Sequence, residues 1–192
     1  NWVRRMGEYY TGVGVLLGNL DKNGRQYLYA HKFTSSKLRE DDGGIYKISK
    51  SGKILQRFDT QNSILSLAVT SPTSDRVESF YAADNNMNLY RLDGRLNLLQ
   101  KKALQASSAA QEIRIGGVHD YDGDGQNDLL LYSFERLMND KNPLSAERPK
   151  TKVFYSNLKF QIYSQDFSRL IKSISLSEGW KKTYGFAVTD LN

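Results

Sequence analysis

Short apolar segments that each run into a polar turn recur along the chain. They are Val13–Gly18 before Asn19, Ile64–Val69 before Ser71, Ile113–Val118 before Asp120, and Tyr184–Val188 before Asp190. The turns begin 52, 49 and 70 residues apart, and the last interval contains a charged stretch of 18 residues, Glu135–Lys152. Without that stretch the third interval is also 52 residues. The sequence therefore predicts a structural repeat of about fifty residues.

A second pattern follows in the latter part of each repeat, where a strand-like segment leads into a tight turn and a second strand. The three strand-like segments are Ile45–Ile48, Leu89–Leu92 and Phe160–Tyr163. The dipeptide Asp93-Gly94 is typical of a hairpin, because glycine accepts the positive φ that such turns need. One repeat thus holds about four short strands, which in the first copy lie near 13–18, 26–33, 45–48 and 53–58.

Four antiparallel strands in a unit of about 40–50 residues are typical of a propeller blade. We therefore predict an all-β fold, a β-propeller of four-stranded antiparallel blades. We place the blades at about 12–60, 61–108 and 109–178, with the first strand of a fourth in 179–192 and a connector in 1–11. Closed propellers need about 4–8 blades, so either other blades from the rest of a longer protein complete the ring or these blades form an open arc. We favour the first and expect this chain to be part of a larger propeller.

The third turn, Asp120–Asp128, has the composition of a calcium loop. Carboxylates stand at its first, third, fifth and ninth positions, and Gly125 at the sixth permits a sharp reversal of the chain. Calcium prefers about six to eight oxygen ligands. The ligands that we predict for Ca²⁺ are Asp120, Asp122, Asp124, Asp128 and the backbone carbonyl of Gln126.

Two alternatives to this interpretation exist. An EF-hand needs flanking helices and an acid at position twelve, but Leu131 stands there and the flanks are strand-like. Ordinary turns are also rich in Asp, Asn and Gly. Four carboxylates within nine residues would repel one another without a cation, however, which favours the metal site.

The corresponding turns of the other repeats have lost this pattern. Asn19–Tyr27 keeps the glycine but has Tyr27 at position nine and a positive charge at Lys22, so we expect a hydrogen-bonded turn there. Ser71–Asp75 lacks the pattern. Asp190 and Asn192 would be the first and third positions of a further loop.

The segment Gly117–Leu131, with its Asp-Tyr-Asp-Gly-Asp-Gly-Gln-Asn-Asp loop, resembles the FG-GAP/VCBS repeat of integrin-α-type propellers. Tyr184–Asn192 resembles the opening of the next such repeat. The Gly-Ala-Pro element of the family is replaced by Tyr132-Ser133-Phe134. The resemblance implies a propeller with seven or eight blades and calcium in the loops between the first two strands. It also implies binding of proteins or carbohydrates, or service as a sensor or accessory domain.

The amino-acid composition excludes several kinds of functional site. The chain has no cysteine, which excludes disulfides, thiolate metal sites and a thiol nucleophile. The net charge of +6 could indicate nucleic acid, but the basic residues are scattered, and we expect solvated strand faces and no nucleic-acid role. No apolar run is long enough for a membrane span. His119 lies beside Asp120, but with no nucleophile motif nearby we expect it to pack at a strand end.

The sequence thus favours a non-catalytic, calcium-stabilised module that recognises a protein or carbohydrate, in a bacterial protein located outside the cytoplasm. We expect surface loops at Thr34–Gly44 and Glu135–Lys152, which either carry recognition or are solvated insertions without a role. Trp2 and Trp180 could stack on sugars, although we expect Trp180 to pack between blades. The alternative function is an accessory or catalytic propeller of an enzyme, of the polysaccharide lyase or quinone-dependent dehydrogenase type. That function would need acids, histidine or arginine that converge on the central funnel.

Overall fold

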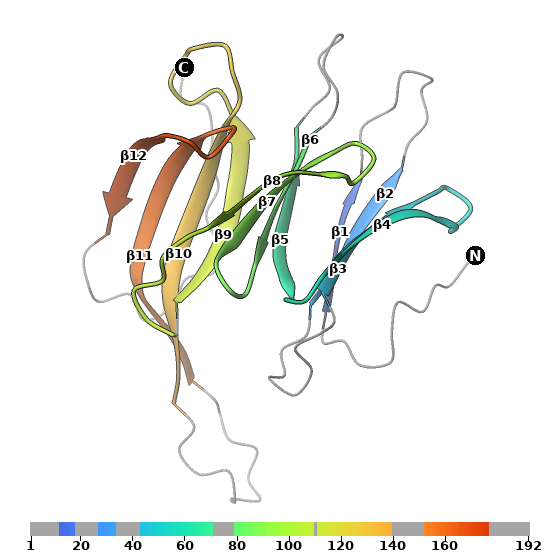
Figure 1. The fold of residues 1–192 in the computed structure, drawn as a ribbon. Helices are drawn as coiled ribbons and strands as arrows, with labels where there is room; N and C mark the ends of the chain where they lie inside the picture. Colours follow the sequence, from blue (N-terminus) through green and yellow to red (C-terminus); the bar gives the residue numbers. More distant parts are fainter. Residues whose placement is uncertain are drawn as a thin grey trace, which may run out of the picture.

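The computed structural model describes residues 12–17, 27–33, 43–70, 79–109, 111–139 and 152–176, and all their regular structure is β (Figure 1). The first six strands are β1 (Gly12–Leu17), β2 (Leu28–Phe33), β3 (Gly43–Ile48), β4 (Ile54–Thr60), β5 (Ile64–Val69) and β6 (Ser79–Asp84). The other six are β7 (Asn88–Asp93), β8 (Leu98–Ala103), β9 (Gln111–His119), β10 (Asp128–Asn139), β11 (Lys152–Ser164) and β12 (Leu170–Ser175). Within these ranges no helix could span a membrane.

The strands form three sheets of four antiparallel strands, and in each sheet neighbours in space are neighbours in sequence. We call these sheets the first (β1–β4), second (β5–β8) and third (β9–β12) blades. Figure 1 shows them side by side, and β5 of the middle blade contacts both β2 and β9. The predicted fold class, an all-β propeller arrangement of four-stranded blades, is confirmed. The connector 1–11 and the first strand of a fourth blade lie outside the described residues.

The core consists of two apolar clusters, one on each side of the second blade. Successive residues of a strand point to opposite faces of the sheet, so one strand can serve both clusters. In β6, Phe80 and Ala82 join the cluster shared with the first blade, while Tyr81 and Ala83 join the cluster shared with the third. All four are completely buried. The near-continuous apolar composition of β6 therefore reflects a strand that is covered on both faces.

The turns between the last two strands of each blade share one backbone feature. Gly52, Leu96 and Phe167 occupy equivalent positions in these turns and have φ values of 82°, 60° and 57°. Leu96 is only 4% exposed and packs in the first cluster, whereas Phe167 is 1% exposed and packs in the second. The left-handed conformation disfavours side chains with a Cβ. In these turns the burial of Leu96 and Phe167 offsets that cost.

The loop expected at Glu135–Lys152 is shorter than predicted, because both of its ends belong to strands. β10 continues to Asn139, and β11 begins at Lys152, with Glu135 opposite Ser156 and Asn139 opposite Lys152. The pairing resumes after a register shift between Ser133 and Glu135. Strand-favouring residues such as Val153 and Phe154 explain why the hairpin extends into this stretch. The stretch Thr34–Gly44 is likewise shorter than expected, because β3 begins at Gly43.

Candidate functional site

The acidic loop joins the first two strands of the third blade. β9 ends at His119, β10 begins at Asp128, and these two residues pair in register across the ladder. The loop between them therefore starts and finishes at adjacent points of the sheet. Both flanking elements are strands, so the loop is not an EF-hand.

Three of the predicted ligands come together at the surface. One carboxylate oxygen from each of Asp120, Asp122 and Asp124 lies within 4.8 Å of the other two, and all three residues are exposed. Two oxygens that contact one calcium ion at about 2.3–2.6 Å can be separated by at most about 5 Å. The spacing of these oxygens therefore fits a single calcium ion.

Backbone N–H groups hold the loop in this shape. The Oδ1 atom of Asp120 accepts hydrogen bonds from the N–H groups of Gly123 at 2.7 Å and Asp124 at 3.1 Å, and its Oδ2 atom accepts one from Gly125 at 2.8 Å. Gly123 and Gly125 both have a φ of 79°, a conformation that glycine adopts without strain. Because a carboxylate oxygen has more than one lone pair, these bonds leave capacity for a cation.

Asp128 lies at the base of the loop, outside the surface group of three acids. It is only 2% exposed, and its Oδ2 atom accepts the N–H of Tyr121 at 3.0 Å. Burial raises the pKa of Asp128, and the nearby charges of Asp122 and Asp124 raise it further, although the Tyr121 N–H opposes both effects. A cation in the loop would relieve this charge repulsion.

Gln126, the fifth predicted ligand, contacts the next hairpin of the blade. Its Oε1 atom accepts a hydrogen bond from Gln165 Nε2 at 3.2 Å. A hollow of about 220 Å³ lies between the loop and this β11–β12 turn, lined by Asp124, Gln126, Asp128 and residues 164–166, 168 and 169. In an antiparallel meander the first and third connections lie at the same end of the sheet, which explains why these two turns meet.

The β11–β12 turn contributes a cation that sequence reasoning did not associate with the loop. Arg169 Nη2 lies 3.0 Å from Asp122 Oδ2 and 4.0 Å from Asp124 Oδ2. Asp166 lines the same hollow, and hydrogen bonds from the Ser164 and Ser168 hydroxyls lower its pKa to about 2. The repeat pattern together with strand order could have identified both residues as neighbours of the loop.

The two residues beside the loop's first aspartate pack against each other. The rings of His119 and Tyr121 lie 5.8 Å apart and meet edge to face. Tyr121 also lies over Gly117, where an added Cβ would come within 2.9 Å of the tyrosine Oη. This arrangement agrees with the expected packing role of His119.

The remaining sequence-predicted positions have no described structure. These are the parts of the turn Asn19–Tyr27 before Tyr27, the turn Ser71–Asp75, Asp190, Asn192, Trp2 and Trp180. The middle of the Glu135–Lys152 stretch, from 140 to 151, also lies outside the described residues.

No protein-family model and no curated protein sequence matches the chain. Among solved structures, a similar one is described as "Crystal structure of BBS1N in complex with ARL6DN, soaked with lead". The two chains are 11% identical, with a TM-score of 0.38 over 88% of this chain. The matched region covers 56% of that protein's chain.

Proposed function

We propose that this chain is a non-catalytic β-propeller module, stabilised by calcium, that recognises a protein or carbohydrate as part of a larger protein. The observation that carries the calcium part is the approach of three carboxylate oxygens, from Asp120, Asp122 and Asp124, to within 4.8 Å of one another. An oxygen-only donor set at this spacing suits a hard cation, and calcium tolerates the irregular geometry of a surface loop better than magnesium.

In this proposal the ion neutralises like charges that the fold itself brings together. Asp120, Asp122 and Asp124 would bind it directly, the backbone carbonyl of Gln126 would complete the upper shell, and Asp128 would support it from the base. Because β9 and β10 are joined through this loop, binding would stabilise the folded blade relative to the unfolded chain. Millimolar calcium outside the cytoplasm would fill even a weak site, which supports an extracytoplasmic setting.

The recognition part of the proposal rests on the scaffold. Two buried clusters, each shared by neighbouring blades, fix the three blades relative to one another. A rigid β scaffold that presents loops and clefts between its blades is well suited to ligand recognition. The acids of the calcium loop are already engaged by backbone N–H groups and Arg169, which favours a structural role for them over proton transfer.

Thermal unfolding in EDTA and in excess calcium tests the stabilising role. The melting temperature of the wild-type chain should rise with calcium, whereas that of Asp124→Asn should not. Asp59→Asn is the matched control, because Asp59 is an exposed acid on β4 that pairs with Arg57, far from the loop in sequence. A calcium-dependent rise in Asp124→Asn equal to that of the wild type would contradict the proposal, as would no rise in the wild type.

A further inference from the structure

On one face of the third blade, the side chains are apolar near the core and polar farther from it. Leu129 and Leu131 of β10 belong to the cluster shared with the second blade, and they lie opposite Tyr163 and Gln161 of β11. Directly opposed residues in an antiparallel ladder share a face, so Lys159, Gln161 and Tyr163 form a row on the same side. Polar side chains therefore stand where the outer part of one blade faces its neighbour.

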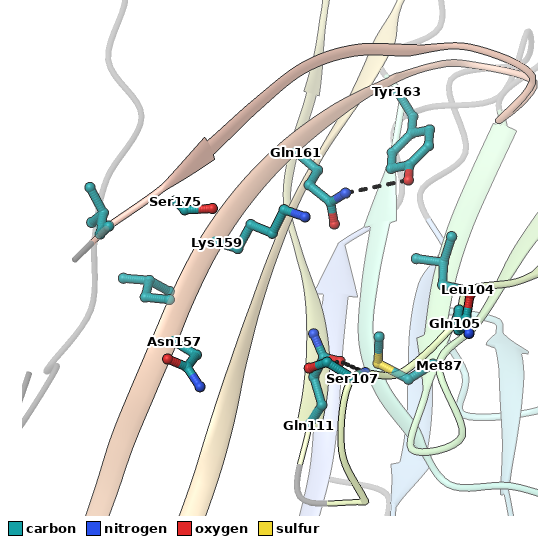
Figure 2. Close-up of a pocket in the computed structure, with 12 residues that line it drawn as sticks. Met87, Leu104, Gln105, Ser107, Gln111, Asn157, Lys159, Gln161, Tyr163 and Ser175 are labelled. Carbon is teal, nitrogen blue, oxygen red and sulfur yellow. Dashed lines mark hydrogen bonds between the residues drawn. The ribbon is translucent and has the colours of Figure 1, made fainter. Parts of the chain in front are cut away.

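A cavity of about 440 Å³ lies along this row. Figure 2 shows Lys159, Gln161 and Tyr163 extending from β11 on one side of it, with Met87, Leu104 and Gln111 on the other. Met87 lies in the β6–β7 turn, Leu104 in the segment that links the second and third blades, and Gln111 at the start of β9. The volume of the cavity is within the range of about 300–1,000 Å³ that is typical of small-molecule sites.

The charge of this cavity is positive and uncompensated by the residues described around it. Its described lining contains no aspartate or glutamate. Within the described part of the chain, the Nζ atom of Lys159 makes no hydrogen bond or ion pair. Glu135, on the neighbouring strand, is instead engaged by Asn157 Nδ2 at 2.7 Å. Lys159 is partly buried, and an ammonium group without a counter-charge at the wall of a cavity favours a ligand that carries an anionic group.

Four carboxamide side chains also line the cavity, those of Gln105, Gln111, Asn157 and Gln161. Gln111 Oε1 accepts hydrogen bonds from the N–H of Ser107 at 2.6 Å and its hydroxyl at 3.0 Å, which leaves the Nε2 atom of Gln111 free to donate. Gln161 Nε2 donates to Tyr163 Oη at 3.4 Å, which leaves the Oε1 atom of Gln161 free to accept. Such a mixed set complements hydroxyl groups, which both donate and accept. Met87 and Leu104 give the cavity an apolar wall.

We propose that the cavity between the second and third blades binds a sugar that carries a carboxylate group. Lys159 pairs with the carboxylate, the carboxamides of Gln111 and Gln161 bind hydroxyl groups, and Met87 and Leu104 contact the C–H face of the ring. This inference rests on the proposed recognition function and assigns it a site. It does not depend on the calcium loop, since none of the loop residues lines the cavity.

The test is an NMR titration of the full chain with methyl β-D-glucuronide and methyl β-D-galacturonide. The matched neutral probe is methyl β-D-glucoside, which differs from the first uronide only in having a hydroxymethyl group in place of the carboxylate. At least one uronide should shift the amide signals of residues 157–163 and 104–111, with the glucoside much weaker. Lys159→Met should weaken uronide binding about tenfold, the loss expected for one charged hydrogen bond, while Lys159→Arg retains most of it.

Lys172→Met serves as the charge-matched control, because Lys172 lies on β12 opposite Ile162 and so faces away from the row. Equal binding of glucoside and glucuronide, equal binding by the wild type and Lys159→Met, or no shift with either uronide would overturn the proposal. Circular dichroism confirms that each variant is folded. Asp124→Asn should bind the uronide as the wild type does, so a failed calcium site and a failed sugar site give different results.

Discussion

The guanidinium of Arg169 lies 3.0 Å from the carboxylate of Asp122, so the third blade places its own cation at the edge of the acidic loop. The arginine is the last residue of the β11–β12 turn, immediately before β12, and its side chain is 58% exposed. An exposed pair of this kind contributes about 0–1 kcal/mol to stability. Its larger effect is on any metal ion, because a positive charge beside the loop opposes the binding of another.

Arg169→Gln should therefore increase the calcium affinity of the loop several-fold. The substitution removes the competing charge while keeping a long polar side chain at the rim of the hollow. Calorimetric titration of the variant and the wild type with calcium measures the change, and melting in EDTA should show a loss of no more than about 1 kcal/mol. Weaker calcium binding by Arg169→Gln would mean that the arginine supports the site.

A buried carboxylate, Asp84, should be the most sensitive acid of the second blade. It is completely buried, and its Oδ2 atom accepts hydrogen bonds from Asn62 Nδ2, Asn88 Nδ2 and Tyr90 Oη, while its Oδ1 atom accepts two backbone N–H groups. Asp84→Asn would direct an amide donor toward three donors. We expect a loss of about 2–4 kcal/mol in the free energy of unfolding, measured with urea.

Asp93 provides the matched comparison, since it makes the same turn at the other end of β7. Its Oδ1 atom accepts the N–H groups of Arg95 and Asn97, and its Oδ2 atom accepts Asn97 Nδ2, all at an exposed position. Asp93→Asn should cost about 1 kcal/mol or less. Similar losses in the two variants would show that burial of the Asp84 network contributes little.

Stability should fall as the pH drops through the range in which an unfolded histidine gains its proton. His31 is buried and donates from Nδ1 to the carbonyl of Ile64 at 2.9 Å. Burial lowers the pKa of His31 below its usual 6.5, and Arg114 lowers it further, although the bond to Ile64 opposes both. The folded state therefore stays neutral where the unfolded state binds a proton, so stability is full above pH 6.5 and decreases below it.

Urea denaturation between pH 8 and 5.5 measures this effect, which cannot exceed about 1.4 kcal/mol per pH unit for one group. His31→Asn keeps an N–H donor for Ile64 and should flatten the dependence. The control, His119→Asn, changes an exposed histidine and should leave the slope intact. A wild-type slope that survives in His31→Asn would assign the effect to another group.

The repeat and the fold class could be predicted from sequence because they depend on local patterns. Alternation in segments such as Leu89–Leu92 fixes which residues face a core, and Asp93-Gly94 fixes a turn. The grouping of Asp120, Asp122 and Asp124 follows from their spacing in one loop. Their surroundings were harder to predict, since Arg169 lies 47 residues after Asp122 and reaches it only through the meander of the blade.

Other features could not be predicted because tertiary packing overrides the local signal. Phe167 adopts a φ of 57°, which sequence rules disfavour for a bulky residue, and it does so because its ring packs edge to face on Tyr81 of the neighbouring blade. The cavity beside Lys159 likewise depends on how the second and third blades diverge. Its residues come from four separate segments whose patterns carry no shared motif.

Calorimetric titration of the wild-type chain with calcium tests the central claim most directly. We predict one site per chain for the described loop, with the heat of binding lost in Asp124→Asn and unchanged in Asp59→Asn. Asparagine at position 124 retains an oxygen that can accept the Gln126 N–H, so the loop should keep its shape while losing charge. Equal heats in the wild type and Asp124→Asn would show that calcium does not bind at this loop.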